Sequence, residues 1–168
     1  MAHLEHMTHW SLAERSAARL DGELTLSHLL SDAVDDHHAR AERVLGHYVG
    51  RLVLTGISAL WALGVSDEPR THHVSQSGRR IKLPQSSTFV LEQRAFHPGD
   101  TWGSVTSPRR TAIDLLRAPA GFDPRIVRRL MQMYGLSAEY LNSHLDTLGT
   151  TPGRRLATER LALLVFEQ

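Results

Sequence analysis

The 168-residue sequence has no cysteine, and this absence excludes several kinds of protein. Without thiols the chain has no disulfide bond, no cysteine-ligated zinc site and no cysteine nucleophile. Because reducing compartments favour such chains, we expect a cytoplasmic protein. Apolar runs are also short. None approaches the roughly 20 residues that span a bilayer, so we expect no membrane partner.

Lysine is nearly absent, because Lys82 is the only lysine beside 18 arginines. The charges are also unevenly divided. Residues 1–78 carry 6 basic and 10 acidic side chains, a net charge of −4, whereas residues 79–168 carry 13 basic and 8 acidic, a net charge of +5. A basic second half favours contact with phosphates or with an acidic partner.

Sequence motifs of the common catalytic and nucleotide-binding sites are missing. We find no GxSxG, no P-loop, no GxGxxG and no HExxH, and no nucleophile stands beside a base. The densest possible metal cluster is "DDHH" (35–38), but neighbouring residues on a helix point in different directions. We therefore expect no metal, no cofactor and no enzyme activity.

Helices are predicted at the beginning of the chain. Apolar spacing favours helices over 10–20, from about 25 to 34, and over 36–49, where Gly50 ends the third. We assign residues 1–34 to a helical extension and residues 35–168 to the main domain.

Short strands follow, separated by brief links. The ranges 51–56, 71–75, 88–96 and 104–107 have strand character. Between the first two, "SALWALG" (58–64) favours a short helix capped by Ser58. Residues 76–87 form a polar connection, and "HPGDTWG" (97–103) is typical of a turn.

The last part of the chain is predicted to be a helical bundle. Ser107-Pro108 and Asp123-Pro124 each place a capping side chain before a proline at the first helical position. Ser137 and Thr151-Pro152 open two more helices. N-terminal helices, a small sheet and C-terminal helices together indicate the α+β class, not a doubly wound sheet.

Arginines supply the candidate binding residues. On the helix from Pro108, Arg110, Asp114 and Arg117 share a narrow arc, which most often means a structural ion pair, worth only about 0.3–0.5 kcal/mol if exposed. Arginines in a first helical turn oppose the helix dipole, so Arg109 and Arg110 are the residues we expect to make outward contacts.

A second basic face lies on the next predicted helix. Arg125, Arg128 and Arg129 lie opposite its apolar side. This face suits a nucleic-acid backbone, or it is a solvated surface. Three basic residues of the polar connection would extend this positively charged surface: Arg79, Arg80 and Lys82.

Two segments together resemble a known family. "LVLTGISALWALGV" (52–65) is similar to the strand–Gly–Ser-Ala helix element of the AbiEi-family antitoxins, the regulators of type IV toxin–antitoxin systems. "SVTSPRRTAIDLLR" (104–117) resembles their second signature, a Thr-Ser/Pro–Arg-Thr–Asp-Leu helix start. The motif residues concerned are Gly56, Ser58, Ser107, Pro108 and Asp114.

The resemblance, over roughly residues 35–165, implies an antitoxin that neutralises a nucleotidyltransferase-type toxin and doubles as a transcriptional regulator on operator DNA. We expect no counterpart of the family's winged helix-turn-helix, since only about 50 residues, with a net acidic charge, precede the first strand and no wing hairpin is recognisable among them. Two alternatives stay open: a nuclease-like enzyme using the residues around 35–38 with Asp114, and a non-catalytic domesticated interaction domain.

Overall fold

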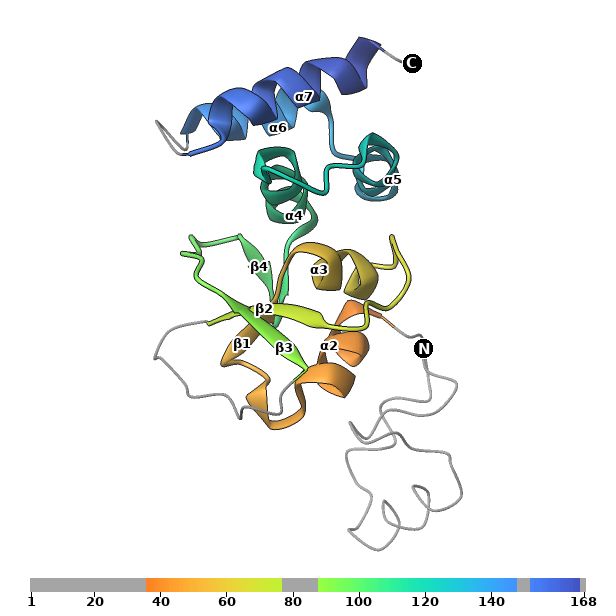
Figure 1. The fold of residues 1–168 in the computed structure, drawn as a ribbon, viewed down its shortest axis with the longest axis vertical. Helices are drawn as coiled ribbons and strands as arrows, with labels where there is room; N and C mark the ends of the chain where they lie inside the picture. Colours follow the sequence, from red (N-terminus) through yellow and green to blue (C-terminus); the bar gives the residue numbers. More distant parts are fainter. Residues whose placement is uncertain (1–35, 77–87, 148–151, 167–168) are drawn as a thin grey trace, which may run out of the picture.

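A computed structural model describes residues 36–76, 88–147 and 152–166, which form a small sheet joined to a set of helices (Figure 1). The class is α+β, as the sequence predicts. The predicted helices within residues 1–34 lie outside the described residues, and so do Arg79, Arg80 and Lys82 of the polar connection.

Within the described residues the sheet has five strands, in the order β3-β2-β1-β5-β4. Their bounds are β1 Leu52–Leu54, β2 His72–Gln76, β3 Phe89–Glu92, β4 Thr101–Trp102 and β5 Val105–Thr106. β1 is antiparallel to β2 and parallel to β5, β2 is parallel to β3, and β4 is antiparallel to β5. The sheet is therefore mixed, with β3 and β4 at its edges.

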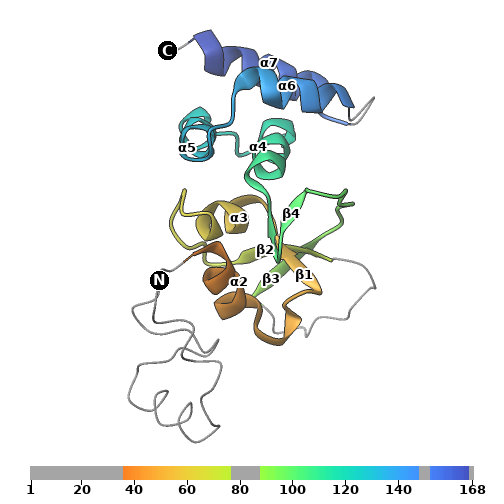
Figure 2. The same ribbon diagram turned by 180° about the vertical axis from the view of Figure 1, so that it is seen from behind.

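Six α-helices are described. Their bounds are α2 His37–Leu45, α3 Gly56–Ala62, α4 Pro108–Arg117, α5 Pro124–Tyr134, α6 Ala138–Thr147 and α7 Arg154–Phe166. α2 and α3 pack on the sheet, α4 and α5 form the next level, and α6 and α7 lie furthest from the strands (Figures 1 and 2). α4 contacts α3, α5, α6 and α7, so it connects the sheet to the bundle.

The helix starts follow the capping signals in the sequence. The Ser107 side chain accepts a hydrogen bond from the Arg110 N–H at 3.3 Å, and Pro108 is the first residue of α4. The Asp123 carboxylate accepts the Arg125 N–H at 2.8 Å before α5. Gly135, in the left-handed conformation, ends α5. These predictions are confirmed.

The two marker segments lie side by side in the fold. Leu54 of β1 is paired in parallel with Val105 of β5, and each strand leads directly into a helix. Those helices, α3 and α4, are in contact. Leu54, Val105 and Ile113 are each fully buried in one core that continues from the sheet into the bundle. The motifs are thus two adjacent strand–helix units.

Three details of the prediction were wrong. The helix over 36–49 ends at Leu45 and not at Gly50, because Gly46 turns the chain with a positive φ of 51° and a short 3₁₀ turn follows over Gly46–Tyr48. Ser58 does not cap its helix, which begins at Gly56 after Thr55. The stretch 97–103 is not only a turn, since it contains β4.

Among the described residues, no helix has both the length and the apolar character needed to cross a membrane.

Candidate functional site: an ion-pair network at the junction of sheet and bundle

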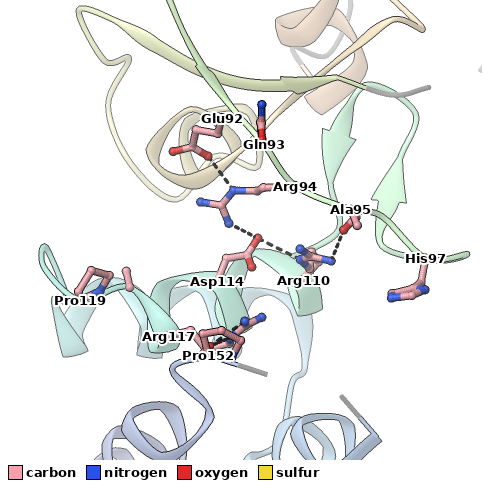
Figure 3. Close-up of a pocket in the computed structure, with 11 residues that line it drawn as sticks. Glu92, Gln93, Arg94, Ala95, His97, Arg110, Asp114, Arg117, Pro119 and Pro152 are labelled. Atoms are coloured by element: carbon pink, nitrogen blue, oxygen red, sulfur yellow. Dashed lines mark hydrogen bonds and ion pairs between the residues drawn. The ribbon is translucent and has the colours of Figure 1, made fainter. Parts of the chain in front are cut away.

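Alternating carboxylates and arginines connect the edge strand β3 to helix α4. We call them the ion-pair network. In the order of their contacts, its members are Glu92, Arg94, Asp114, Arg110, Asp100 and Arg109. They come from β3 and the link after it, from the residue before β4, and from α4. Figure 3 shows four of them facing one another across the gap between β3 and α4.

Asp114 lies between two arginines in this network. Its Oδ2 is 2.6 Å from Nη1 of Arg94 and accepts a bond from Nε of Arg110 at 3.0 Å. The Asp114 side chain is only 6% exposed. Because a carboxylate taken out of water must be paired, the two guanidinium groups offset the cost of burying the Asp114 side chain.

Asp100, the residue before β4, is likewise a buried carboxylate that contacts two arginines. Its Oδ2 accepts bonds from Nη1 of Arg110 at 2.5 Å and from the His97 N–H at 2.9 Å. Burial alone would raise the pKa of the Asp100 carboxyl, but the His97 N–H and the charge of Arg110 outweigh it, so the pKa lies below its ordinary value. Asp100 is therefore ionised at neutral pH.

Glu92 closes the network at the sheet edge. Its carboxylate accepts from Thr55 Oγ1 at 2.8 Å and from Arg94 Nε at 2.7 Å, and it lies 2.9 Å from Nδ1 of His73. These hydrogen bonds lower the pKa of Glu92 against the opposing effect of burial. The network thereby joins β2, β3 and the start of α3.

A pocket of about 630 Å³ opens beside the network. Arg94, Arg110 and Arg117 line it together with Glu92 and Asp114. Arg117 donates two bonds to the Pro152 carbonyl, at 3.0 and 2.8 Å, so it ties α4 to the start of α7. The lining combines cations with carboxylates that already have partners, and among its described residues there is no serine, threonine, cysteine or lysine nucleophile.

The arginines predicted to point outward from α4 are placed differently. The Arg110 side chain is only 11% exposed and faces Asp100, Asp114 and the Ala95 carbonyl. The prediction of an outward Arg110 was wrong, because acceptors from the loops around β3 and β4 draw the side chain inward. The ion pair with Asp114 exists as predicted, and it is largely shielded from solvent, since the two side chains are 11% and 6% exposed. Arg109 is partly exposed.

The other predicted site residues are spread over the fold. Arg125 and Arg129 are exposed on α5, and Arg128 is half-buried. Gly56 begins α3 with a φ of 53°, a value that favours glycine. The buried Ser58 hydroxyl accepts the His73 N–H at 2.8 Å, which holds α3 against β2.

The described residues of the histidine-rich stretch 35–38 make structural contacts. The Asp36 carboxylate accepts the N–H groups of His38 and Ala39 and so caps α2. The His37 ring lies 5.5 Å from the ring of Trp102. Asp35 is outside the described residues. Within the described ranges, no group of three or more histidine, aspartate and glutamate side chains is arranged to hold a metal ion.

The sequence reasoning missed Arg94, Asp100 and Glu92, although they carry half of the network. One signal was present: a Glu-x-Arg pair on an amphipathic strand places both side chains on one face. Asp100 gave no such signal, because its role depends on a turn that brings it next to α4.

Comparisons of the chain with protein families, with curated proteins and with solved structures find no match.

Proposed function

We propose that this chain is an antitoxin-like regulatory protein of the AbiEi type, which acts by binding a partner protein and not by catalysis. One observation carries the proposal. The two segments that resemble the family lie next to each other as parallel strand–helix units, Leu54 opposite Val105. A pair of motifs from distant parts of the sequence thus forms one structural element, as expected of a shared fold.

The marker residues are engaged in structural contacts, which counts against a catalytic role for them. Ser107 caps a helix, Ser58 accepts a backbone N–H, and Asp114 is ion-paired with two arginines. A general acid or base must reach a substrate proton, and these groups are already bonded within the fold. The nuclease-like alternative has less support, because Asp36 is used as a helix cap and Asp114 as an ion-pair partner.

Expression in growing cells tests the proposal. The product of the adjacent gene is expressed alone and then together with this chain. We expect growth arrest in the first case and recovery in the second. An adjacent product that does not arrest growth, or whose toxicity the chain does not relieve, contradicts the antitoxin function.

Operator binding is a second arm of the proposal, supported by the exposed arginines of α5. Fluorescence anisotropy with the chain's own promoter DNA measures it at several salt concentrations. If Arg125 and Arg129 each neutralise a phosphate, replacing either with alanine weakens binding and reduces the steepness of the salt dependence by about 0.9. Arg70→Ala is a matched control, since Arg70 is exposed outside α5. If the chain does not bind this DNA, or if Arg70→Ala weakens binding as much as the α5 variants do, operator binding is contradicted.

A further inference from the structure

Aromatic side chains surround a small hollow where β4, α4, α5 and α6 meet. We call it the aromatic hollow and define it by Trp102, Arg109, Tyr134 and Tyr140, which line a volume of about 140 Å³. The rings of Trp102 and Tyr134 meet edge to face with centroids 5.8 Å apart. Trp102 is 41% exposed and Tyr140 is 47% exposed. Two large aromatic side chains are thus presented to solvent at one place.

The contacts that Arg109 makes in this hollow are long. Its guanidinium is 3.4 Å from the Tyr140 hydroxyl, 3.4 Å from the Gly99 carbonyl and 3.5 Å from Asp100 Oδ1. Its Nε is buried and has no hydrogen-bond partner among the described residues. The next residue, Arg110, makes contacts of 2.5 to 3.1 Å. Since charge-assisted bonds are normally shorter than about 3 Å, Arg109 can still bind a stronger acceptor.

The size of the hollow favours a protein side chain over a small molecule. Pockets for small ligands usually have volumes of about 300–1,000 Å³, well above the 140 Å³ here. Since the hollow lies below that range, we expect it to take a single side chain. Tryptophan, tyrosine and arginine are also the residues that dominate the binding energy of protein–protein interfaces.

The local charge does not favour nucleic acid. Single-stranded nucleic acid is bound by aromatic side chains in a groove with several cations. Of the described residues that line the hollow, only Arg109 has a formal charge. Nearby, burial and the charge of Arg109 lower the pKa of His144, which is therefore neutral at pH 7. One cation suits one carboxylate better than a row of phosphates.

We propose that the aromatic hollow is the docking site for a partner protein, which inserts one large apolar side chain and places a neighbouring aspartate or glutamate against Arg109. This inference rests on the proposed function, because it identifies the surface by which a binding module holds its partner. The apolar side chain packs between Trp102 and Tyr140, and the carboxylate replaces the long contacts of Arg109.

A displayed library of random twelve-residue peptides tests this site without knowledge of the natural partner. The library is selected on the full chain, and enriched peptides are synthesised with a fluorescent label. We expect them to share a large apolar residue next to an acidic one. In anisotropy titrations, Trp102→Ala and Arg109→Gln weaken binding at least tenfold, whereas Leu163→Ala, a 60% exposed control on α7, leaves it unchanged.

A double-mutant cycle separates a direct contact from a disturbed structure. Changing the acidic residue of the peptide to its amide weakens binding to the wild-type chain but has little further effect on Arg109→Gln. The result that overturns the inference is an enriched set without acidic residues, or one that binds Trp102→Ala as well as wild type. A labelled oligothymidine whose binding requires Trp102, or a dimer of the chain that Trp102→Ala dissociates, also overturns it.

The outcome of the peptide selection can be told apart from the outcome of the co-expression test. A chain that selects apolar-acidic peptides but does not relieve the adjacent product's toxicity keeps the docking site and loses the antitoxin function. A chain that relieves toxicity but selects no such peptides keeps the function and loses this site.

Discussion

At the scale of single residues, Asp114 shows how this fold keeps charge in its interior. The carboxylate is shared by Arg94 and Arg110, which approach it from a loop and from its own helix. Such a group adds little stability compared with an apolar residue, but its removal leaves two guanidinium groups facing each other. The cost of losing Asp114 is therefore repulsion and desolvation, not merely the absence of one hydrogen bond.

We expect Asp114→Asn to lower the free energy of unfolding by about 3 kcal/mol, the usual cost of breaking a buried pair. Glu159→Gln is the control, because Glu159 forms the same helical i,i+4 pair with Arg155 but both side chains are exposed. The control should cost less than about 0.5 kcal/mol. Urea unfolding measures both. Equal losses would mean that the burial of Asp114 has no energetic consequence.

Ser58 gives a second prediction at this scale. Its buried hydroxyl accepts the His73 N–H, so Ser58→Ala leaves that N–H without an acceptor. We expect a loss of about 1–3 kcal/mol in the free energy of unfolding. Ser143→Ala removes an exposed hydroxyl that donates to the Tyr140 carbonyl at 2.9 Å, and should change stability by less than about 0.5 kcal/mol. If Ser58→Ala is as mild as Ser143→Ala, the hydroxyl does not hold α3 to β2.

At the scale of elements, helix α4 connects the sheet with the helical bundle. It contributes Arg109, Arg110 and Asp114 to the ion-pair network, and its C-terminal residue Arg117 bonds to the Pro152 carbonyl just before α7. There the chain needs glycine. Gly153 has a φ of 78°, and a Cβ at this position would lie 2.8 Å from the Arg117 carbonyl oxygen. Two helices can approach this closely only without a side chain.

Gly153→Ala should therefore destabilise the protein by more than about 2 kcal/mol, because it adds a steric conflict with backbone to the cost of a left-handed alanine. Gly121→Ala is the matched control. Its φ of 76° is nearly the same, but a Cβ there meets no atom within 4 Å. We expect about 1 kcal/mol for the control. Thermal or urea unfolding that fails to separate the two variants would contradict a close approach of α4 and α7.

Element boundaries show what the sequence can and cannot predict. Ser107-Pro108 and Asp123-Pro124 located two helix starts, because capping is a local interaction. β4 was not found, because two residues have no periodicity and Thr101–Trp102 becomes a strand only by pairing with β5. The alternation expected along 88–96 is also weak, since Val90 and Leu91 of the edge strand β3 are both exposed.

The site was less predictable than the fold. The pair of Arg110 with Asp114 follows from helical spacing, and it is present. The direction of Arg110 does not follow from spacing, because Asp100 and the Ala95 carbonyl reach it from other segments. Tertiary acceptors, which no local pattern encodes, decided which arginines face the interior.

At the scale of the whole molecule, buried titratable groups link stability to pH. Burial lowers the pKa of His37, His72 and His144. Just below about pH 6.5, the unfolded chain therefore binds more protons than the folded one, which destabilises the fold. Glu92 and Asp100 have lowered pKa values as well. Their stabilisation is present above the unfolded pKa of about 4 and is lost as the pH falls through the folded values.

We therefore expect the urea midpoint to be nearly constant from about pH 7 to 8, to decrease below about pH 6.5 and to fall more steeply below about pH 4. His72→Phe, which removes a buried ring whose Nδ1 has no hydrogen-bond partner among the described residues, should reduce the first decrease and leave the second. A stability maximum near about pH 5 would contradict the assignment of neutral buried histidines.

Binding to a protein partner is the property on which the proposed function depends. The decisive measurement is native mass spectrometry of the chain co-expressed with the tagged product of the adjacent gene and purified through that tag. We predict a complex of defined stoichiometry that contains both polypeptides and persists at about 0.5 M salt, where exposed charges are strongly screened. Recovery of the tagged product alone, from cells in which both proteins are soluble, would contradict the proposed function.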